Sequence, residues 1–274
     1  MKSGKIKKIV REGYAKIANQ NTSCSCCGST ESAQDIGKKI GYTAEELQEV
    51  PEGTMSLGCG NPVALASLRE GETVLDLGSG TGLDCFIAAN KVGKNGKVIG
   101  VDMTPEMIEK ARKNARKGNY RNVEFRLAEI EKLPLTDNSV NVVISNCVIN
   151  LSPDKKRVFK ETFRVLKPGG RLMISDIVLL KELPDSIKTS IDAYVGCLSG
   201  AMMKDDYIGA IKSAGFRNIR IMDETTFPIE LIESDPTVKT VIDNLKIPRE
   251  ILKELASSAV SIKIHAVKQN GKET

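Results

Sequence analysis

The feature that most constrains this chain is a regular alternation of short apolar segments with helix-forming segments over residues 71–176. Helices are expected in the gaps between the apolar segments, because strands and helices alternating at this spacing form right-handed βαβ units. The prediction is an α/β fold with a doubly wound, mostly parallel sheet. The five predicted core strands are Thr73–Leu77, Lys97–Val101, Val123–Arg126, Val140–Ser145 and Gly170–Ser175.

Local signals predict where the helices of this core begin and end. Thr104 precedes Pro105 and Ser152 precedes Pro153, and a capping side chain followed by proline is typical of a helix N-terminus. The segment 167–170, Lys-Pro-Gly-Gly, is expected to end the helix that starts at Pro153.

The core has a flanking segment on each side. Residues 1–70 are predicted to be an N-terminal extension, in which a helix with an apolar stripe precedes a Cys/Ser/Gly loop. Residues 71–180 form the core, and residues 181–274 form a C-terminal cap with amphipathic helices over 185–199 and 204–215. Two late strands, near 218–222 and 260–267, bring the expected sheet to seven strands. The apolar stripe of the first helix is Ile6, Ile9, Val10, Tyr14 and Ile17.

Composition excludes several classes of protein. Hydrophobic residues make up 41% of the chain, which is too many for a disordered protein. No apolar run approaches the ~20 residues of a membrane span, and no apolar stretch follows the basic N-terminus as in a secretory signal. A net charge of +5, with 4% aromatic residues and no Trp, argues against nucleic-acid binding. We therefore expect a cytoplasmic protein that contacts neither nucleic acid nor membrane.

The single histidine limits the chemistry. His265 alternates with Ile262, Ile264 and Ala266 in the last predicted strand, so it is expected on the polar, solvent side rather than as a ligand. Mechanisms that need a histidine base together with a histidine ligand are excluded.

A glycine-rich turn follows the first core strand. Residues 76–82 read Asp-Leu-Gly-Ser-Gly-Thr-Gly, and glycines at such a turn let the backbone approach a ligand closely at a helix N-terminus. Asp102 ends the next strand, where an acid would bind ribose hydroxyls. Together these features predict a cofactor that contains adenosine.

The spacing of the turn distinguishes between cofactors. It is not the Gly-x-Gly-x-x-Gly of pyrophosphate sites, and no Walker lysine follows. With its acid two residues earlier, it resembles the first motif of class I S-adenosylmethionine (SAM) methyltransferases, which have a Rossmann-like fold. The later motifs that carry the same resemblance are Val101–Met103, Glu129–Leu135, Asn141–Asn146 and Leu166–Gly170.

This resemblance implies a set of cofactor-binding residues. The turn residues would line the methionine end, Asp102 and Met103 would hold the ribose and one face of the adenine, and Glu129 and Ile130 would lie at the adenine edge. Tyr14 is the residue of the first helix expected to close over the cofactor. The remaining expected cofactor residues are Asp76, Gly78, Ser79, Gly80 and Asn146.

Seven cysteines are an unusual number for an intracellular chain, where they indicate metal, redox or thiolate chemistry before disulfide staples. Cys147 follows the fourth strand, where ligands of open α/β sheets bind. Cys59 lies in a Gly-Cys-Gly-Asn-Pro turn without apolar periodicity, and Cys197 lies in the predicted cap. Cys85, in the first core helix, is predicted to pack.

These cysteine segments resemble those of arsenite methyltransferases. The matching segments are Gly-Cys-Gly-Asn-Pro at 58–62, Ser-Asn-Cys-Val-Ile-Asn-Leu-Ser-Pro-Asp-Lys at 145–155, and Gly-Cys-x-x-Gly-Ala at 196–201. The resemblance implies that Cys59, Cys147 and Cys197 bind trivalent arsenic. A fourth cysteine, which is one of Cys24, Cys26 and Cys27 with Cys26 favoured, would help resolve oxidised species. No metal site beyond this arsenic substrate is expected.

Thiolate chemistry is consistent with this interpretation. Arsenite is thiophilic, and three thiolates leave the arsenic lone pair free to attack the sulfonium methyl group in line. No proton has to leave the nucleophile, so no catalytic histidine is needed. Methyl transfer formally oxidises arsenic, and a pair of cysteines can return the electrons as a disulfide, which a thioredoxin- or glutathione-type reductant must reduce.

Three alternatives remain. Cys24, Cys26, Cys27 and Cys59 could form a structural zinc site, although adjacent cysteines ligate one tetrahedral ion poorly. The protein could methylate a small organic acceptor such as a quinone or sterol, although six Phe and five Tyr are few for an apolar pocket. A non-catalytic metalloid sensor is the third, although the acid and glycines of the core are all present.

Overall fold

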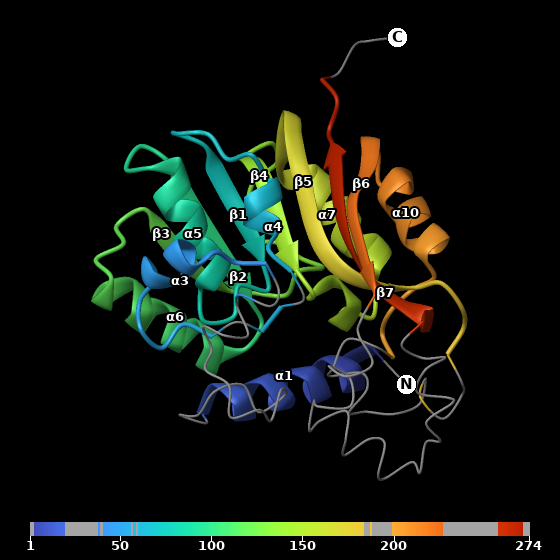
Figure 1. The fold of residues 1–274 in the computed structure, drawn as a ribbon, viewed down its shortest axis with the longest axis horizontal. Helices are drawn as coiled ribbons and strands as arrows, with labels where there is room; N and C mark the ends of the chain where they lie inside the picture. Colours follow the sequence, from blue (N-terminus) through green and yellow to red (C-terminus); the bar gives the residue numbers. More distant parts are fainter. Residues whose placement is uncertain are drawn as a thin grey trace.

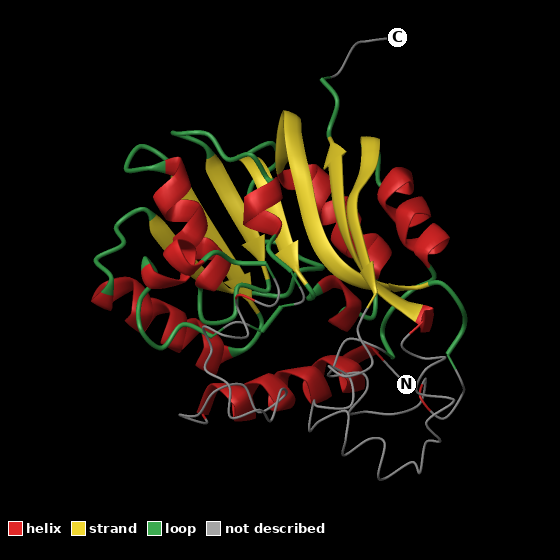
Figure 2. Ribbon diagram, in the orientation of Figure 1, coloured by secondary structure: helices red, strands yellow, loops and turns green. Residues whose placement is uncertain are grey.

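The computed structural model describes residues 3–19, 38, 41–55, 57–58, 60–183, 187, 199–226 and 257–270. Within them, one seven-stranded sheet with the order β3-β2-β1-β4-β5-β7-β6 runs through the molecule, with helices on both of its faces (Figures 1 and 2). β7 is antiparallel to both of its neighbours, and the other adjacent pairs are parallel. The predicted doubly wound, mostly parallel sheet is confirmed.

The strands agree with the predicted segments and are mostly longer at one or both ends. They are β1 (Thr73–Leu77), β2 (Lys97–Asp102), β3 (Val123–Leu127), β4 (Val140–Asn146), β5 (Leu166–Leu179), β6 (Arg217–Thr226) and β7 (Ala259–Val267).

The helices divide between the two faces of the sheet and the edge where its strands end. They are α1 (Ser3–Asn19), α3 (Ala44–Gln48), α4 (Pro62–Leu65), α5 (Leu83–Val92), α6 (Pro105–Lys117), the 3-10 turn η1 (Ile149–Leu151), α7 (Lys155–Val165) and α10 (Lys204–Ser213).

Strand alternation creates two separate cores. Val74 and Ile144 point to one face and pack with apolar residues of α5 and α6, including Phe86. Leu75, one residue after Val74, points to the other face and packs with residues of α7 and α10, including Tyr207. Because strands covered on both faces must be apolar on both, these strands read as continuous apolar runs in the sequence.

The start of α7 differs from the prediction. The helix begins at Lys155, with Asp154 rather than Ser152 as its N-cap, and the Asp154 carboxylate accepts a hydrogen bond from the Arg157 amide at 3.0 Å. The Ser152 hydroxyl donates to Glu131 at 2.7 Å and accepts a hydrogen bond from the Asp154 amide at 3.1 Å. Asp and Ser are about equally good caps, so the residue types alone do not distinguish the two positions.

The segment 167–170 does not end α7, because the helix stops at Val165 and strand β5 starts at the next residue. This segment lies where the register between β4 and β5 shifts. Val140 is opposite Leu166, whereas Val142 is opposite Arg171. Lys-Pro-Gly-Gly is therefore an irregularity within the strand.

His265 is half-buried rather than on the solvent side, because β7 lies between β5 and β6. Burial lowers the pKa of its imidazole, and the positive charges of Arg171 and Arg220 lower it further.

Helix α1 crosses the edge of the sheet where the parallel strands end (Figure 1). Its Val10 packs with Cys147 and Leu151, and its Ile17 packs with Met107 of α6. Of the apolar stripe predicted from the helical spacing, Ile6, Val10, Tyr14 and Ile17 belong to these packed clusters. Among the described residues, no helix has the length and apolarity that crossing a membrane requires.

At the opposite edge, Arg171 of β5 connects several segments. Its guanidinium forms two hydrogen bonds with the Glu72 carboxylate, at 2.7 and 2.8 Å. It also donates to the carbonyl oxygens of Ala66 and Ser67, at 2.7 and 2.8 Å. The side chains of the pair are only 16% and 13% exposed, so solvent screens the interaction weakly.

We expect Arg171→Met to lower the free energy of unfolding by about 2–4 kcal/mol, because it leaves a largely buried carboxylate and two carbonyls without their donor. Urea unfolding followed by circular dichroism measures this loss. The control is Lys97→Met, which breaks the exposed pair with Glu124 and should cost less than about 1 kcal/mol. Equal losses in the two variants would contradict the assignment.

Candidate functional site

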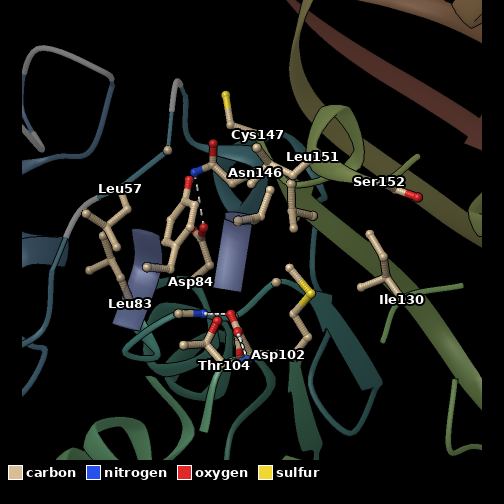
Figure 3. Close-up of a pocket in the computed structure, with 18 of the residues that line it drawn as sticks. Leu57, Leu83, Asp84, Asp102, Thr104, Ile130, Asn146, Cys147, Leu151 and Ser152 are labelled. Carbon is tan, nitrogen blue, oxygen red and sulfur yellow. Dashed lines mark hydrogen bonds between the residues drawn. The ribbon is translucent and has the colours of Figure 1, made fainter. Parts of the chain in front are cut away.

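A cavity of ≈ 890 Å³, including the part open to solvent, lies where β1, β2 and β4 end (Figure 3). The sheet order reverses between β1 and β4, and open α/β sheets bind ligands at such a switch point. Helix α1 contributes Lys7, Val10 and Tyr14 to the lining.

The glycine-rich turn forms one wall of this cavity. Gly78 and Gly80 have positive φ angles of 67° and 51°, which residues other than glycine rarely adopt. The amides of Gly78 and Ser79 donate to the carbonyl of Val101, at 2.7 and 3.0 Å, and this anchors the turn to β2. The Ser79 hydroxyl is buried, lines the cavity and has no hydrogen-bond partner among the described residues.

Asp102 lies at the end of β2, beside this turn. Its Oδ2 accepts a hydrogen bond from the Gly80 amide at 3.0 Å, and its Oδ1 accepts one from the Thr104 amide at 2.8 Å. Burial raises the pKa of the carboxyl, and these amide donors oppose the shift. Thr104 is the N-cap of α6 by position but makes no side-chain cap, so the capping predicted for its hydroxyl is absent.

A second carboxylate, Asp84, lies in the first turn of α5. Its Oδ1 accepts a hydrogen bond from the Tyr42 hydroxyl at 2.7 Å, and its Oδ2 accepts one from Asn146 Nδ2 at 3.2 Å. Asn146 also donates to the Tyr42 hydroxyl oxygen, at 3.0 Å. These three side chains join the segment before α3, the first turn of α5 and the end of β4 at the cavity wall (Figure 3).

The charges around the cavity are predominantly negative. Burial raises the pKa of Asp84 to about 6, because the hydrogen bonds from Tyr42 and Asn146 offset only part of the desolvation. Among the described lining residues the one basic side chain is Lys7, and its ammonium already lies 2.7 Å from Glu129 and 3.1 Å from Glu131. Such a site favours a ligand that carries positive charge.

Asp76 lies behind the glycine turn and is not among the residues that line the cavity. Its side chain is buried, and its Oδ2 accepts a hydrogen bond from the Cys85 thiol at 3.2 Å. Burial, with the negative charge of Asp84, raises the pKa of Asp76 well above its usual value. Cys85 is a buried free thiol in the core, which confirms that it packs.

Cys147 follows β4 and lines the cavity. Its φ angle of 56° is in the left-handed region, which costs a non-glycine residue on the order of 1–2 kcal/mol. Its amide donates to the Ser175 carbonyl at 2.8 Å, and its side chain contacts Val10 and Leu151. Its sulfur is in a disulfide bond, and the partner lies outside the described residues.

Most of the residues predicted for the site lie together. Glu129 is an exception, because it faces a neighbouring groove, where its carboxylate accepts from Lys7. Cys24, Cys26, Cys27, Cys59 and Cys197 lie outside the described residues. The predicted residues that do line the cavity are Tyr14, Gly78, Ser79, Gly80, Asp102, Met103, Ile130, Asn146 and Cys147.

The lining residues that were not predicted from the sequence include Asp84, Tyr42 and Glu131. Asp84 follows the glycine turn by two residues, so its place in the first helical turn was a usable signal. Glu131 directly follows the predicted pair Glu129 and Ile130, which was also a usable signal. Tyr42 carries no comparable signal, because packing brings it to the cavity from another segment.

The described residues include no group of three or more His, Cys, Asp or Glu side chains that could hold a metal ion. The zinc alternative depends on cysteines outside the described residues. The arrangement that the structure does show is a cavity with buried carboxylates, a glycine turn and a cysteine on its walls.

Comparisons with known proteins also indicate a methyltransferase. A family model described as a methyltransferase domain matches residues 68–215. The arsenite methyltransferase of Halobacterium salinarum is 49% identical over 235 residues, which are 80% of this chain and 60% of that protein. This chain therefore spans less than two thirds of that relative's length.

A solved structure gives the same family. The crystal structure of an arsenic(III) S-adenosylmethionine methyltransferase from Chlamydomonas reinhardtii is 33% identical, with a TM-score of 0.63. The match covers 88% of this chain and 75% of that one. A quinone-biosynthesis C-methyltransferase of Salmonella arizonae is more distant, at 30% identity over 60% of this chain and 67% of that protein.

The chain is thus a methyltransferase-domain protein, and it belongs to the arsenite methyltransferase family.

Proposed function

We propose that this chain transfers the methyl group of SAM to trivalent arsenic held by cysteine thiolates. The observation that carries the proposal is that Cys147 lines the same cavity as the glycine turn and the buried carboxylates. A thiophilic acceptor and a cationic methyl donor would therefore meet in one enclosed space.

The cavity residues fit this cofactor. SAM, when bound, supplies an electrophilic methyl group on a sulfonium, and it also carries an ammonium group. Asp84 and Asp102 offer carboxylates to positive charge and to ribose hydroxyls, and the buried hydroxyl of Ser79 has no partner among the described residues. The predicted roles of Tyr14, Met103 and Ile130 at the nucleoside remain proposals.

The neighbours of Cys59 support its place in the arsenic site. A Cβ atom on Gly58 would lie 2.2 Å from the Asn146 amide, and one on Gly60 would lie 2.1 Å from the Ser175 hydroxyl oxygen. Asn146, the last residue of β4, is the register partner of Ser175 within β5, beside Cys147. The backbone on both sides of Cys59 therefore lies against the segment that carries Cys147, which supports joint binding of arsenic.

The proposed reaction balances without a base. The arsenic lone pair forms a bond to the methyl carbon while the carbon–sulfur bond breaks, and its electron pair stays on sulfur. Arsenic passes formally from the trivalent to the pentavalent state, and two cysteine thiolates return two electrons by forming a disulfide. The disulfide at Cys147 supports the presence of a second cysteine within reach. Reduction of that disulfide would need an external thiol of the thioredoxin or glutathione type.

Transfer of labelled methyl from SAM to arsenite, with excess dithiol, tests the proposed reaction. We expect a labelled methylarsenical from the wild type and a loss of at least about 100-fold for Cys147→Ser, because a hydroxyl binds arsenic(III) poorly. Cys59→Ser should behave in the same way.

The control is Cys85→Ala, which removes a buried thiol outside the cavity and should retain activity within a few-fold. A demethylated quinone serves as a second acceptor in the same assay. Label in the quinone rather than in a methylarsenical would show that the acceptor is organic and would reject the proposed arsenic substrate.

The affinity for S-adenosylhomocysteine should depend on pH through Asp84. Its carboxylate form attracts the ligand's ammonium, so protonation as the pH falls through about 6 weakens binding. Titration calorimetry should show a dissociation constant about tenfold larger at pH 5 than at pH 7. In Asp84→Asn the affinity should be lower at pH 7 and nearly flat over this range. An unchanged pH dependence in that variant would reject the assignment.

Gly60→Ala should weaken arsenite binding at least about tenfold, because the new methyl group must displace Ser175 of β5. Binding of S-adenosylhomocysteine should stay within about twofold. Adding Ser175→Ala, which removes the clashing oxygen, should restore part of the arsenite affinity. Gly209→Ala is the matched control, since a Cβ there meets nothing within 4 Å. Undiminished arsenite binding in Gly60→Ala would argue against this role for the turn.

A further inference from the structure

The backbone at Cys147 is held in a conformation that needs support. The left-handed φ of 56° is unfavourable for a residue with a side chain, so neighbouring contacts must stabilise it. The next residues, Val148 to Leu151, form a short loop and the 3-10 turn η1. One contact to β5 is already described, from the Cys147 amide to the Ser175 carbonyl.

A second connection to β5 comes from Asn150 in η1. Its Nδ2 donates to the Ile177 carbonyl at 2.6 Å and to Asp176 Oδ1 at 2.8 Å. Asn150 is fully buried, and its Oδ1 has no partner among the described residues. Among the described residues, the hydrogen bonds of this side chain therefore all join the Cys147 loop to β5.

Asp176 is the centre of this connection. Besides Asn150, its Oδ1 accepts the Ile177 amide at 2.9 Å, and its Oδ2 accepts the Tyr207 hydroxyl at 2.9 Å. Tyr207 belongs to α10, is fully buried, and packs edge-on against Phe159 with ring centroids 5.3 Å apart. The carboxyl thus joins the loop, β5 and α10 at one point.

A carboxyl group in this position is costly for stability. Asp176 is fully buried, and burial raises its pKa to about 7, although the hydrogen bonds from Tyr207, Ile177 and Asn150 and the charge of Lys155 oppose the shift. Replacing both partners of a buried hydrogen bond by apolar groups of the same shape can be nearly neutral for stability. The network therefore calls for an explanation other than stability.

We propose that Asp176 and Asn150 are positioning residues for Cys147, which hold its loop against β5 so that this cysteine lines the cavity in a fixed place. The expected effect of these residues on arsenic binding rests on the proposed function. Its structural part, the placement of one cysteine by a buried amide and carboxyl, is independent of which acceptor is used.

The test compares Asp176→Leu and Asn150→Ala with Asp176→Asn. Both disrupting variants should raise the KM for arsenite at least tenfold, with kcat changed less and the dissociation constant of S-adenosylhomocysteine within twofold. Asp176→Asn keeps an oxygen for Asn150 and an amide group for the Tyr207 oxygen, so its KM should stay within about threefold of the wild type.

A second readout does not depend on arsenic. Peptide mass spectrometry can follow the alkylation of Cys147 by iodoacetamide in fully reduced protein. The alkylation rate should be at least fivefold higher in the two disrupting variants than in the wild type. Asp176→Asn should resemble the wild type. This measurement remains decisive if the wild type makes no methylarsenical, an outcome that would reject the proposed function alone.

Several outcomes would overturn the inference. One is an unchanged alkylation rate at Cys147 in Asn150→Ala, the milder variant, which serves even if Asp176→Leu does not fold. Another is a parallel loss of arsenite activity and S-adenosylhomocysteine binding in all three variants, which indicates a general structural role.

Discussion

Two loops pass each other at the ends of β1 and β4, and they fit only because residue 78 is glycine. A Cβ atom there would lie 2.3 Å from a methyl group of Val148, the residue after Cys147. The cofactor turn and the cysteine loop are therefore in direct contact, without an intervening side chain on the turn. This close approach places the glycine turn and Cys147 on the walls of one cavity.

The same principle applies on the other side of the cysteine loop. Gly58 and Gly60 approach Asn146 and Ser175 more closely than any side chain would allow. Backbone on both sides of the β4 end is thus brought within contact distance by glycine. Since Asn146 also contacts Asp84 and Tyr42, a shift in the Gly58–Gly60 turn would reach the acidic wall of the cavity.

Local patterns in the sequence predicted much of this arrangement. The strands follow from apolar runs, because strands covered on both faces leave no room for polar alternation. The glycine turn, Asp102 and Cys147 were also predicted, since each follows a strand that the sequence marks. The end of α7 differed because Lys-Pro-Gly-Gly suits a strand irregularity as well as a helix stop.

Residues that reach the cavity through tertiary contacts could not be predicted from sequence patterns. Tyr42 arrives from a segment 42 residues away from its partner Asp84, and nothing in its neighbourhood indicates that it faces a cavity. Asp76, which the family motif suggested as a lining residue, is instead held behind the turn by the Cys85 thiol. Spacing identifies the turn but does not show which side of it each side chain occupies.

The composition of the cavity bears on the kind of nucleophile that it serves. The chain's one histidine, His265, lies on β7 and is not among the lining residues. Of the acids that line the cavity, Asp102 and Asp84 accept hydrogen bonds at both oxygens, so each is held in place by its donors. An acceptor that must lose a proton during methyl transfer would need one of these carboxylates as its base. An arsenic lone pair needs none, so the polar groups can be committed to binding the donor while the thiolates hold the acceptor.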